Sequence, residues 1–405
     1  MIFLVCAGPF GFYLLFRCFL PLVWCFNFIY TNNNHHNIEL VYFHTFYLLI
    51  NTFLCIKIIK YIAYSTIPKP AYHRSLYSRS EGSFGFYAAV FTFIFLYIVL
   101  GDQIPIFAAE GGSEALLNFS KQNKTTSWII FGIIDLLILY FLVTFNSTEG
   151  KFKRYISLLL SLFGSISAGS KVGLVAFFGK FFTIQALFKK DKLSIKTITF
   201  LIISLPLSFA FILIQFARTL DINIPISSAV GVLITLVFNS STSYLNQFIV
   251  RDGIMLSSQY AQMLGDFGFM RYFLNPFLVV FGYDGIGMSI GPYMAGFLYG
   301  QTNDGGVNPI LFFELIFIFG PTIGIPLSFI FMYLIFKLSK FLIKSAFIFK
   351  DTSKIMSACL VGMSFLCLTF LTDTLNAIRA LPFFLIPFIV VMAYKRISKR
   401  NIMMR

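Results

Sequence analysis

Long apolar stretches separated by short polar segments dominate this sequence. A helix needs about 20 apolar residues to cross the ~30 Å hydrocarbon core of a bilayer, and most of these stretches reach or approach that length. The pattern predicts an all-α polytopic bundle, a single integral membrane domain over residues 1–405. About ten spans are expected, at 2–30, 39–59, 84–107, 127–147, 155–169, 172–188, 197–217, 309–336, 355–372 and 377–394.

The positive charges predict how these spans are oriented. Lysine and arginine are concentrated in five segments: 60–82, 148–154, 189–196, 337–354 and the tail after 394. The alternate connections are poor in both residues for their length: 31–38, 102–126, 218–308 and 373–376. Cytoplasmic loops of membrane proteins are enriched in Lys and Arg, so the bias places both termini in the cytoplasm.

The stretch 155–188 has two possible structures. It could be one long helix, but both of its flanks are basic and are expected on the same side of the membrane. The charge rule therefore predicts a short helical hairpin that turns near 168–171. This hairpin places Lys171 at the outer boundary.

The outer segment 218–308 has about 91 residues, far more than an ordinary connection, and loops of that length are commonly functional. It contains apolar stretches at 225–238 and 273–283, which we expect to fold back onto the membrane surface. If both cross the membrane instead, the number of spans becomes twelve and the orientation of the others is unchanged.

Composition agrees with a membrane protein. The chain is 58% hydrophobic and only 12% charged, about half the charged share of soluble proteins. The net charge of +15 lies mostly beside apolar stretches, so the positive-inside rule explains it better than nucleic acid binding does. The first 30 or so residues lack a basic start, so we expect an uncleaved first span. The six cysteines lie in apolar stretches and are expected to be packing residues.

A few positive charges lie on the expected outer face, against the usual bias. They are Lys121, Lys124, Lys171, Arg218, Arg251, Arg271 and Arg379. A planar guanidinium suits two-point binding of phosphate, so a set of these residues could hold a lipid-linked pyrophosphate. The alternative is that Arg251 beside Asp252, and Arg271 near Asp266, are ordinary solvated loop charges.

Other charged residues fall within or near spans, where charge is costly. For Arg17, Asp135 and Lys180 we favour a structural role, in which Arg17 neutralises Asp135 and Lys180 extends toward the interface. Glu314 and Asp304 share the outer zone of the arginines. Either carboxylate could act as a base on a sugar hydroxyl, or could pair with one of the arginines.

The sequence indicates no metal or cofactor chemistry. His35, His36 and His44 have no acidic or cysteine partner at a spacing that would hold a metal. Neither a phosphate-binding glycine-rich loop nor an Asp-x-Asp metal motif is present, which makes a cytoplasmic nucleotide-dependent enzyme an unlikely class.

Four features resemble the O-antigen polymerases (Wzy-type) of bacterial inner membranes. They are Gly169-Ser170-Lys171 at the hairpin tip, where that family has arginine; the long outer loop with Arg251; Asn308-Pro309 followed by Glu314 and the motif Phe319-Gly320-Pro-Thr-Ile-Gly324; and Arg379 before Leu381-Pro382. Together they extend over most of residues 155–394.

The resemblance implies a GT-C-like membrane glycosyltransferase that needs no metal and acts at the periplasmic face of the inner membrane. Its substrates would be oligosaccharide repeat units linked to undecaprenyl pyrophosphate, and its partners membrane lipids, a chain-length regulator and a flippase. Lys171, Arg218, Arg251, Arg271, Asn308 and Arg379 would bind the pyrophosphate, in place of a divalent cation.

Two other functions share some of these features. An O-antigen ligase also has a long outer loop with arginines, but that family's pattern includes a histidine in the loop, and 218–308 contains none. A lipid-linked oligosaccharide flippase is expected to have short outer loops and charges along a central path. The single dominant outer loop favours the polymerase over the flippase.

Overall fold

The regular structure of the chain is helical. The computed structural model describes residues 8–31, 38–64, 86–91, 124–145, 151–167, 171–188, 310–349, 353–372 and 374–403, with positions 93, 94, 97, 98, 259, 260, 262, 270 and 274. No strand occurs among them. The helices are α2 (Pro9–Tyr13), η1 (Leu14–Phe19, a π-helical turn), α3 (Leu20–Thr31), α4 (Ile38–Tyr64), α7 (Lys124–Thr144), α8 (Lys151–Ser167), α9 (Lys171–Phe188), α15 (Leu311–Phe349), α16 (Lys354–Phe370) and α17 (Thr374–Met403).

Four helical segments are long and apolar enough to cross a membrane: Pro9–Thr31, Ile38–Tyr64, Leu311–Phe349 and Asn376–Ile397. They contain 23, 27, 39 and 22 residues, which meets the requirement of about 20. The prediction of an all-α protein embedded in a membrane is therefore confirmed at this level.

The distribution of side chains on α4 also fits a lipid environment. Phe43, Phe46 and Phe53 are 47%, 58% and 56% exposed, whereas the polar side chains of His44 and Asn51 are buried. A water-soluble helix would show the reverse arrangement. The aromatic face of α4 is therefore suited to contact with lipid tails.

α16 lies at the centre of the described helices and packs against α15, α17 and α7. Two buried serines connect it to α15: Ser357 Oγ donates to the carbonyl of Ala346 (2.9 Å), and Ser339 Oγ donates to the carbonyl of Ser364 (3.4 Å). Small hydroxyl residues allow membrane helices to approach closely and to hydrogen-bond across the contact.

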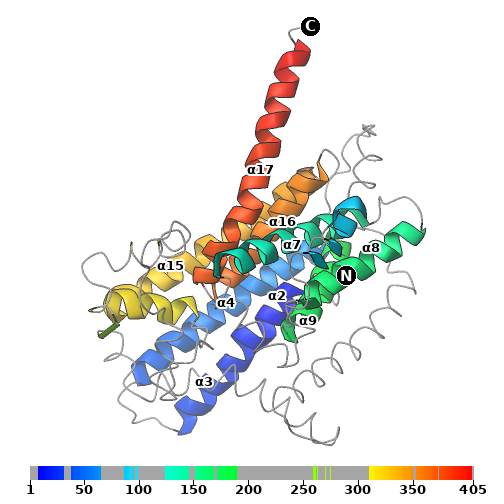
Figure 1. Ribbon diagram of the computed structural model, residues 1–405. Helices are drawn as coiled ribbons and strands as arrows, with labels where there is room; N and C mark the ends of the chain where they lie inside the picture. The colour runs from blue at the N-terminus through cyan, green and yellow to red at the C-terminus, as the bar shows by residue number, and fades with distance from the viewer. Residues whose placement is uncertain are drawn as a thin grey trace, which may run out of the picture.

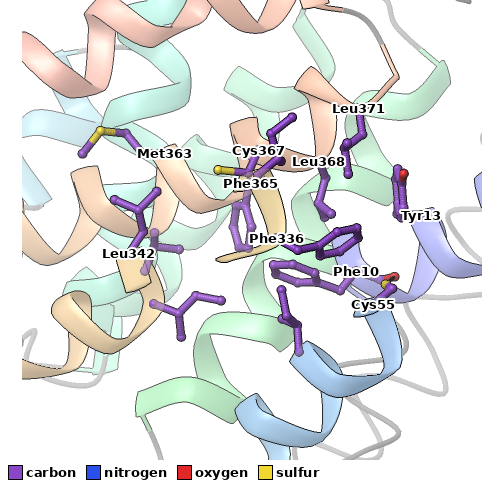
Figure 2. Close-up of a cluster of buried hydrophobic side chains, with 14 of the residues drawn as sticks. Phe10, Tyr13, Cys55, Phe336, Leu342, Met363, Phe365, Cys367, Leu368 and Leu371 are labelled. Carbon is purple, nitrogen blue, oxygen red and sulfur yellow. Dashed lines mark hydrogen bonds between the residues drawn. The ribbon is translucent and has the colours of Figure 1, made fainter. Parts of the chain in front are cut away.

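The N-terminal helix α2 completes this core. The ring of Phe10 meets that of Phe365 edge-on at 6.1 Å, and Tyr13 meets Phe336 at 6.3 Å. Figure 2 shows these aromatic rings in one cluster with Cys55, Cys367 and Leu368. The described cysteines, which are Cys18, Cys25, Cys55, Cys359 and Cys367, are buried thiols, as expected of packing residues.

Most predicted spans correspond to helices of similar bounds. The predicted hairpin at 155–188 is two helices, α8 and α9, which pack against each other. α15 and α17 extend well beyond the predicted ends of their spans, and the second half of α17 rises out of the bundle in Figure 1. The predicted span 197–217 lies outside the described residues, as does nearly all of the outer segment 218–308.

The predicted span 309–336 falls within Leu311–Phe349, which is long and apolar enough to cross a membrane, but its helix is interrupted. The backbone leaves the helical conformation at Gly320, where φ is 76° and ψ is 168°. α15 is therefore two helices, residues 311–319 and residues 321–349, and the break between them shapes the candidate site.

Candidate functional site at the junction of α15, α16 and α17

The break in α15 follows directly from its sequence. Gly320 has a positive φ, which a residue without a Cβ adopts at little cost. Pro321 comes next and suits the first turn of a new helix, where its missing N–H would have no helical partner anyway. The first helix, 311–319, is consequently only about 13 Å long, too short to cross a bilayer.

Gly324 brings the two parts of α15 into direct contact. A Cβ built on Gly324 would lie 2.5 Å from the carbonyl oxygen of Leu315 and 2.6 Å from the Cα of Ile316. Both are backbone atoms, which cannot move aside as a flexible side chain can. The segment Phe319-Gly320-Pro-Thr-Ile-Gly324 is therefore a tight reversal whose two glycines are each required by geometry.

The short helix is enclosed by protein on all sides. All seven residues from Leu311 to Phe317 are buried, so no face of two full turns is open to lipid. Helices that enter a membrane without crossing it are tolerated only where protein or a water-filled cavity surrounds them. The short helix thus has the form of a re-entrant helix.

Glu314 lies in the middle of this short helix and is only 3% exposed. Its Oε1 accepts a hydrogen bond from the backbone N–H of Thr374 (3.4 Å), and its Oε2 accepts one from the Thr374 hydroxyl. Thr374 is the first residue of α17. The carboxylate therefore lies at the N-terminus of α17, where free N–H groups and the helix dipole stabilise negative charge.

A third hydrogen bond, between backbone groups, fixes the same junction. The backbone N–H of Leu311 donates to the carbonyl of Leu371, which follows the last residue of α16, at 3.0 Å. The start of the short helix, the end of α16 and the start of α17 are thus connected by backbone and side-chain bonds.

Arg379 lies close to this junction. It comes five residues after Thr374, about 7.5 Å further along the axis of α17. Its Nη1 donates to Asn376 Oδ1 (3.4 Å), and its side chain is partly exposed. Of the predicted site residues, Glu314 therefore contacts the first residue of α17, and Arg379 lies in the second turn of the same helix.

Two glycines hold this part of α17 in place. A Cβ on Gly362 of α16 would lie 2.4 Å from the ring of Phe384, and one on Gly132 of α7 would lie 2.3 Å from the ring of Phe383. Both aromatic rings of α17 thus lie directly against helix backbone. This packing fixes the rotation of α17 and with it the direction of Arg379.

The intramembrane charges are paired differently from the prediction. Asp135 of α7 forms an ion pair with Lys180 of α9, whereas the prediction paired it with Arg17. The reason is that α7 packs directly against α9, so the lysine reaches the carboxylate instead of extending toward the interface. The predicted structural role of Asp135 and Lys180 agrees with this pair.

The other predicted site residues are not placed. Lys171 is the first residue of α9, but its side chain is outside the described part of the chain, as are Arg218, Arg251, Arg271, Asp304 and Asn308. Their convergence on one site stays a prediction.

The sequence analysis missed Thr374, although a signal was present. The segment Thr372-Asp373-Thr374 precedes an apolar helix and has the residue types that begin helices. Its partner Glu314 lies 60 residues away in sequence, which no local pattern indicates.

A comparison with protein-family models, curated proteins and solved structures finds no match for this chain.

Proposed function

We propose that this protein is a membrane glycosyltransferase that polymerises oligosaccharide repeat units carried on undecaprenyl pyrophosphate into O-antigen or a related surface polysaccharide. The observation that carries the proposal is the junction at which the buried carboxylate of Glu314 holds the first residue of α17, the helix whose second turn carries Arg379. In this proposal the site faces the periplasm.

The reaction needs positive charge beside the leaving group. The acceptor hydroxyl of one repeat unit forms a bond to the anomeric carbon of the donor chain, while the bond from that carbon to the pyrophosphate breaks. Charge then accumulates on the pyrophosphate oxygens, and a preorganised guanidinium is well suited to stabilise it. Arg379 would supply one such group, and Arg251, Arg271, Arg218 and Lys171 would supply others from the outer segments.

The contact with Thr374 suggests a role for Glu314 that differs from the two considered from the sequence, a base on a sugar hydroxyl or an ion-pair partner of an arginine. Because both carboxylate oxygens accept hydrogen bonds from Thr374 and the residue is buried, Glu314 is better suited to positioning α17 than to reaching a sugar hydroxyl. We therefore assign the base, which takes the proton of the acceptor hydroxyl, to Asp304. Asn308, between Asp304 and the short helix, would bind the substrate nearby.

The decisive genetic test uses a bacterial host that makes the matching repeat unit but lacks its own polymerase. We expect the intact chain to restore a ladder of long polysaccharides on a gel, and Arg379→Ala to leave only single repeat units on lipid A. Arg396→Ala is the matched control, since Arg396 is an exposed arginine further along the same helix. An unchanged ladder with Arg379→Ala contradicts the site.

The same host separates the polymerase from its rivals. Loss of a polymerase leaves single repeat units displayed on lipid A, whereas loss of a ligase or a flippase leaves none. The proposal also requires residues 218–308 to lie outside the cytoplasm. Labelling of a cysteine introduced there by a reagent that cannot cross the membrane would support it, and labelling only from the cytoplasmic side would contradict it.

A further inference from the structure

α4 presents a row of buried polar side chains to the short helix of α15. His44, Tyr47 and Asn51 are spaced three and four residues apart, so they lie on one face of α4, over about 10 Å of its length. Their side chains are 0%, 0% and 1% exposed. The rings of His44 and Tyr47 each lie 5.1 Å from the ring of Phe312, which is two residues before Glu314 in the short helix.

Each of these side chains has a polar atom that no described protein group satisfies. Within the described part of the chain, His44 Nε2, Tyr47 Oη and Asn51 Oδ1 are buried and have no hydrogen-bond partner. A buried polar group without a partner is strongly disfavoured, and more so in a membrane protein, whose surroundings offer no water.

The remaining atoms of two of these side chains are well placed. Cys25 Sγ lies 3.4 Å from His44 Nδ1, and Asn51 Nδ2 donates to Tyr13 Oη at 2.7 Å. These contacts connect α4 to α3 and α2 and fix the orientation of the His44 and Asn51 side chains. The unpartnered atoms are therefore held in defined positions along one seam, and the rings of His44 and Tyr47 are 6.5 Å apart.

We propose that this seam is a binding site for ordered water, which bridges His44, Tyr47 and Asn51 between α4, α2 and the short helix of α15. The three atoms offer the mixture of donors and acceptors that internal water requires, with Tyr47 Oη able to serve as both. Bound water satisfies the polar row on α4 at the place where the rings of Phe312 and Phe313 of the short helix pack against it. The inference is independent of the proposed glycosyl transfer.

The test combines two measurements on the purified full-length protein in detergent. Hydroxyl radicals generated by X-rays in isotope-labelled water modify side chains that touch water. We expect Tyr47 to take up the label although it is fully buried. Tyr394, which is 71% exposed beside Lys395 and Arg396, is the positive control, and Phe317, which is 0% exposed within an apolar cluster, is the dry control. A Tyr47 signal no higher than that of Phe317 overturns the proposal.

The second measurement is the Tm of Tyr47→Phe, which removes only the hydroxyl oxygen. If the hydroxyl holds water, its loss leaves the bound water short of a partner, and we expect the Tm to fall by about 1–2 °C. If the hydroxyl is dry, its removal relieves an unsatisfied group and the Tm rises, which contradicts the proposal. Tyr333→Phe, at an exposed position, serves as the control and should leave the Tm unchanged.

Discussion

The carboxylate of Glu314 accepts hydrogen bonds from both the backbone amide and the hydroxyl of Thr374, although the two residues are 60 positions apart in sequence. The contact joins a buried helix too short to cross a membrane to the first turn of the C-terminal helix. It explains how an acidic side chain is accommodated among apolar residues: its charge faces the positive end of α17.

Replacing Thr374 with Ala or Glu314 with Gln should each destabilise the protein, by about 1–3 kcal/mol, because a buried polar group loses a partner. The two substitutions should not be additive, since they remove the same contact. Thermal unfolding of the single and double variants in detergent measures this coupling. Ser353→Ala is a matched control, because Ser353 precedes α16 and its side chain makes no capping hydrogen bond. Full additivity of the two changes contradicts the contact.

The reversal in α15 should be sensitive at both glycines. Gly324→Ala forces a Cβ against the backbone of Leu315 and Ile316, so we expect little folded protein in the membrane. Gly320→Ala adds a side chain at a positive φ with an extended ψ, a region adopted almost only by glycine, and should cost about 1–3 kcal/mol. Size-exclusion chromatography and thermal unfolding give both results.

Gly164 of α8 is the control for these glycine changes. A Cβ there would make an ordinary contact of 3.4 Å with Ile134, and alanine favours a helix, so Gly164→Ala should be tolerated. If the alanine variants of Gly320, Gly324 and Gly164 fold and unfold alike, the chain does not reverse at Gly320 as described.

The packing of α17 against α16 predicts a second-site rescue. Gly362→Ala should destabilise the protein, because its new methyl group overlaps the ring of Phe384. Adding Phe384→Leu makes room beside the methyl group and should recover part of the lost stability. The measurement is thermal unfolding of the single and double variants. If the double variant loses as much stability as the two single variants lose together, Gly362 and Phe384 are not in contact.

Removing one partner of the ion pair between Asp135 and Lys180 should destabilise the protein, and removing both partners should cost less than the sum of the two single changes. Asp135→Asn alone leaves the lysine without its partner, and we expect a loss of about 1 kcal/mol, reduced because Asp135 is 39% exposed. Asp135→Asn with Lys180→Met removes both charges and should cost less than the two single changes together. Lys337→Met serves as the control, and equal additive losses would argue against the pair.

The sequence predicted the helices well because long apolar stretches leave few alternatives to a membrane helix. It also indicated Glu314 and Arg379 as candidates, since charge near an apolar span requires an explanation, and their role stays a prediction. The break at Gly320 was missed, because hydrophobicity continues through the reversal and only the backbone shows its positive φ. Likewise, the partner of Asp135 depends on which helices become neighbours, and α7 and α9 are brought together by tertiary packing.

The most direct test of the account is a polymerisation assay with purified protein in lipid and a defined repeat unit linked to undecaprenyl pyrophosphate. We predict that lipid-linked products gain repeat units and that one undecaprenyl pyrophosphate is released for each bond formed. Arg379→Ala should abolish both, while Arg396→Ala should retain both. Failure of the intact protein to release undecaprenyl pyrophosphate, or equal release by Arg379→Ala, would contradict the assignment of α17 as part of a pyrophosphate-binding site.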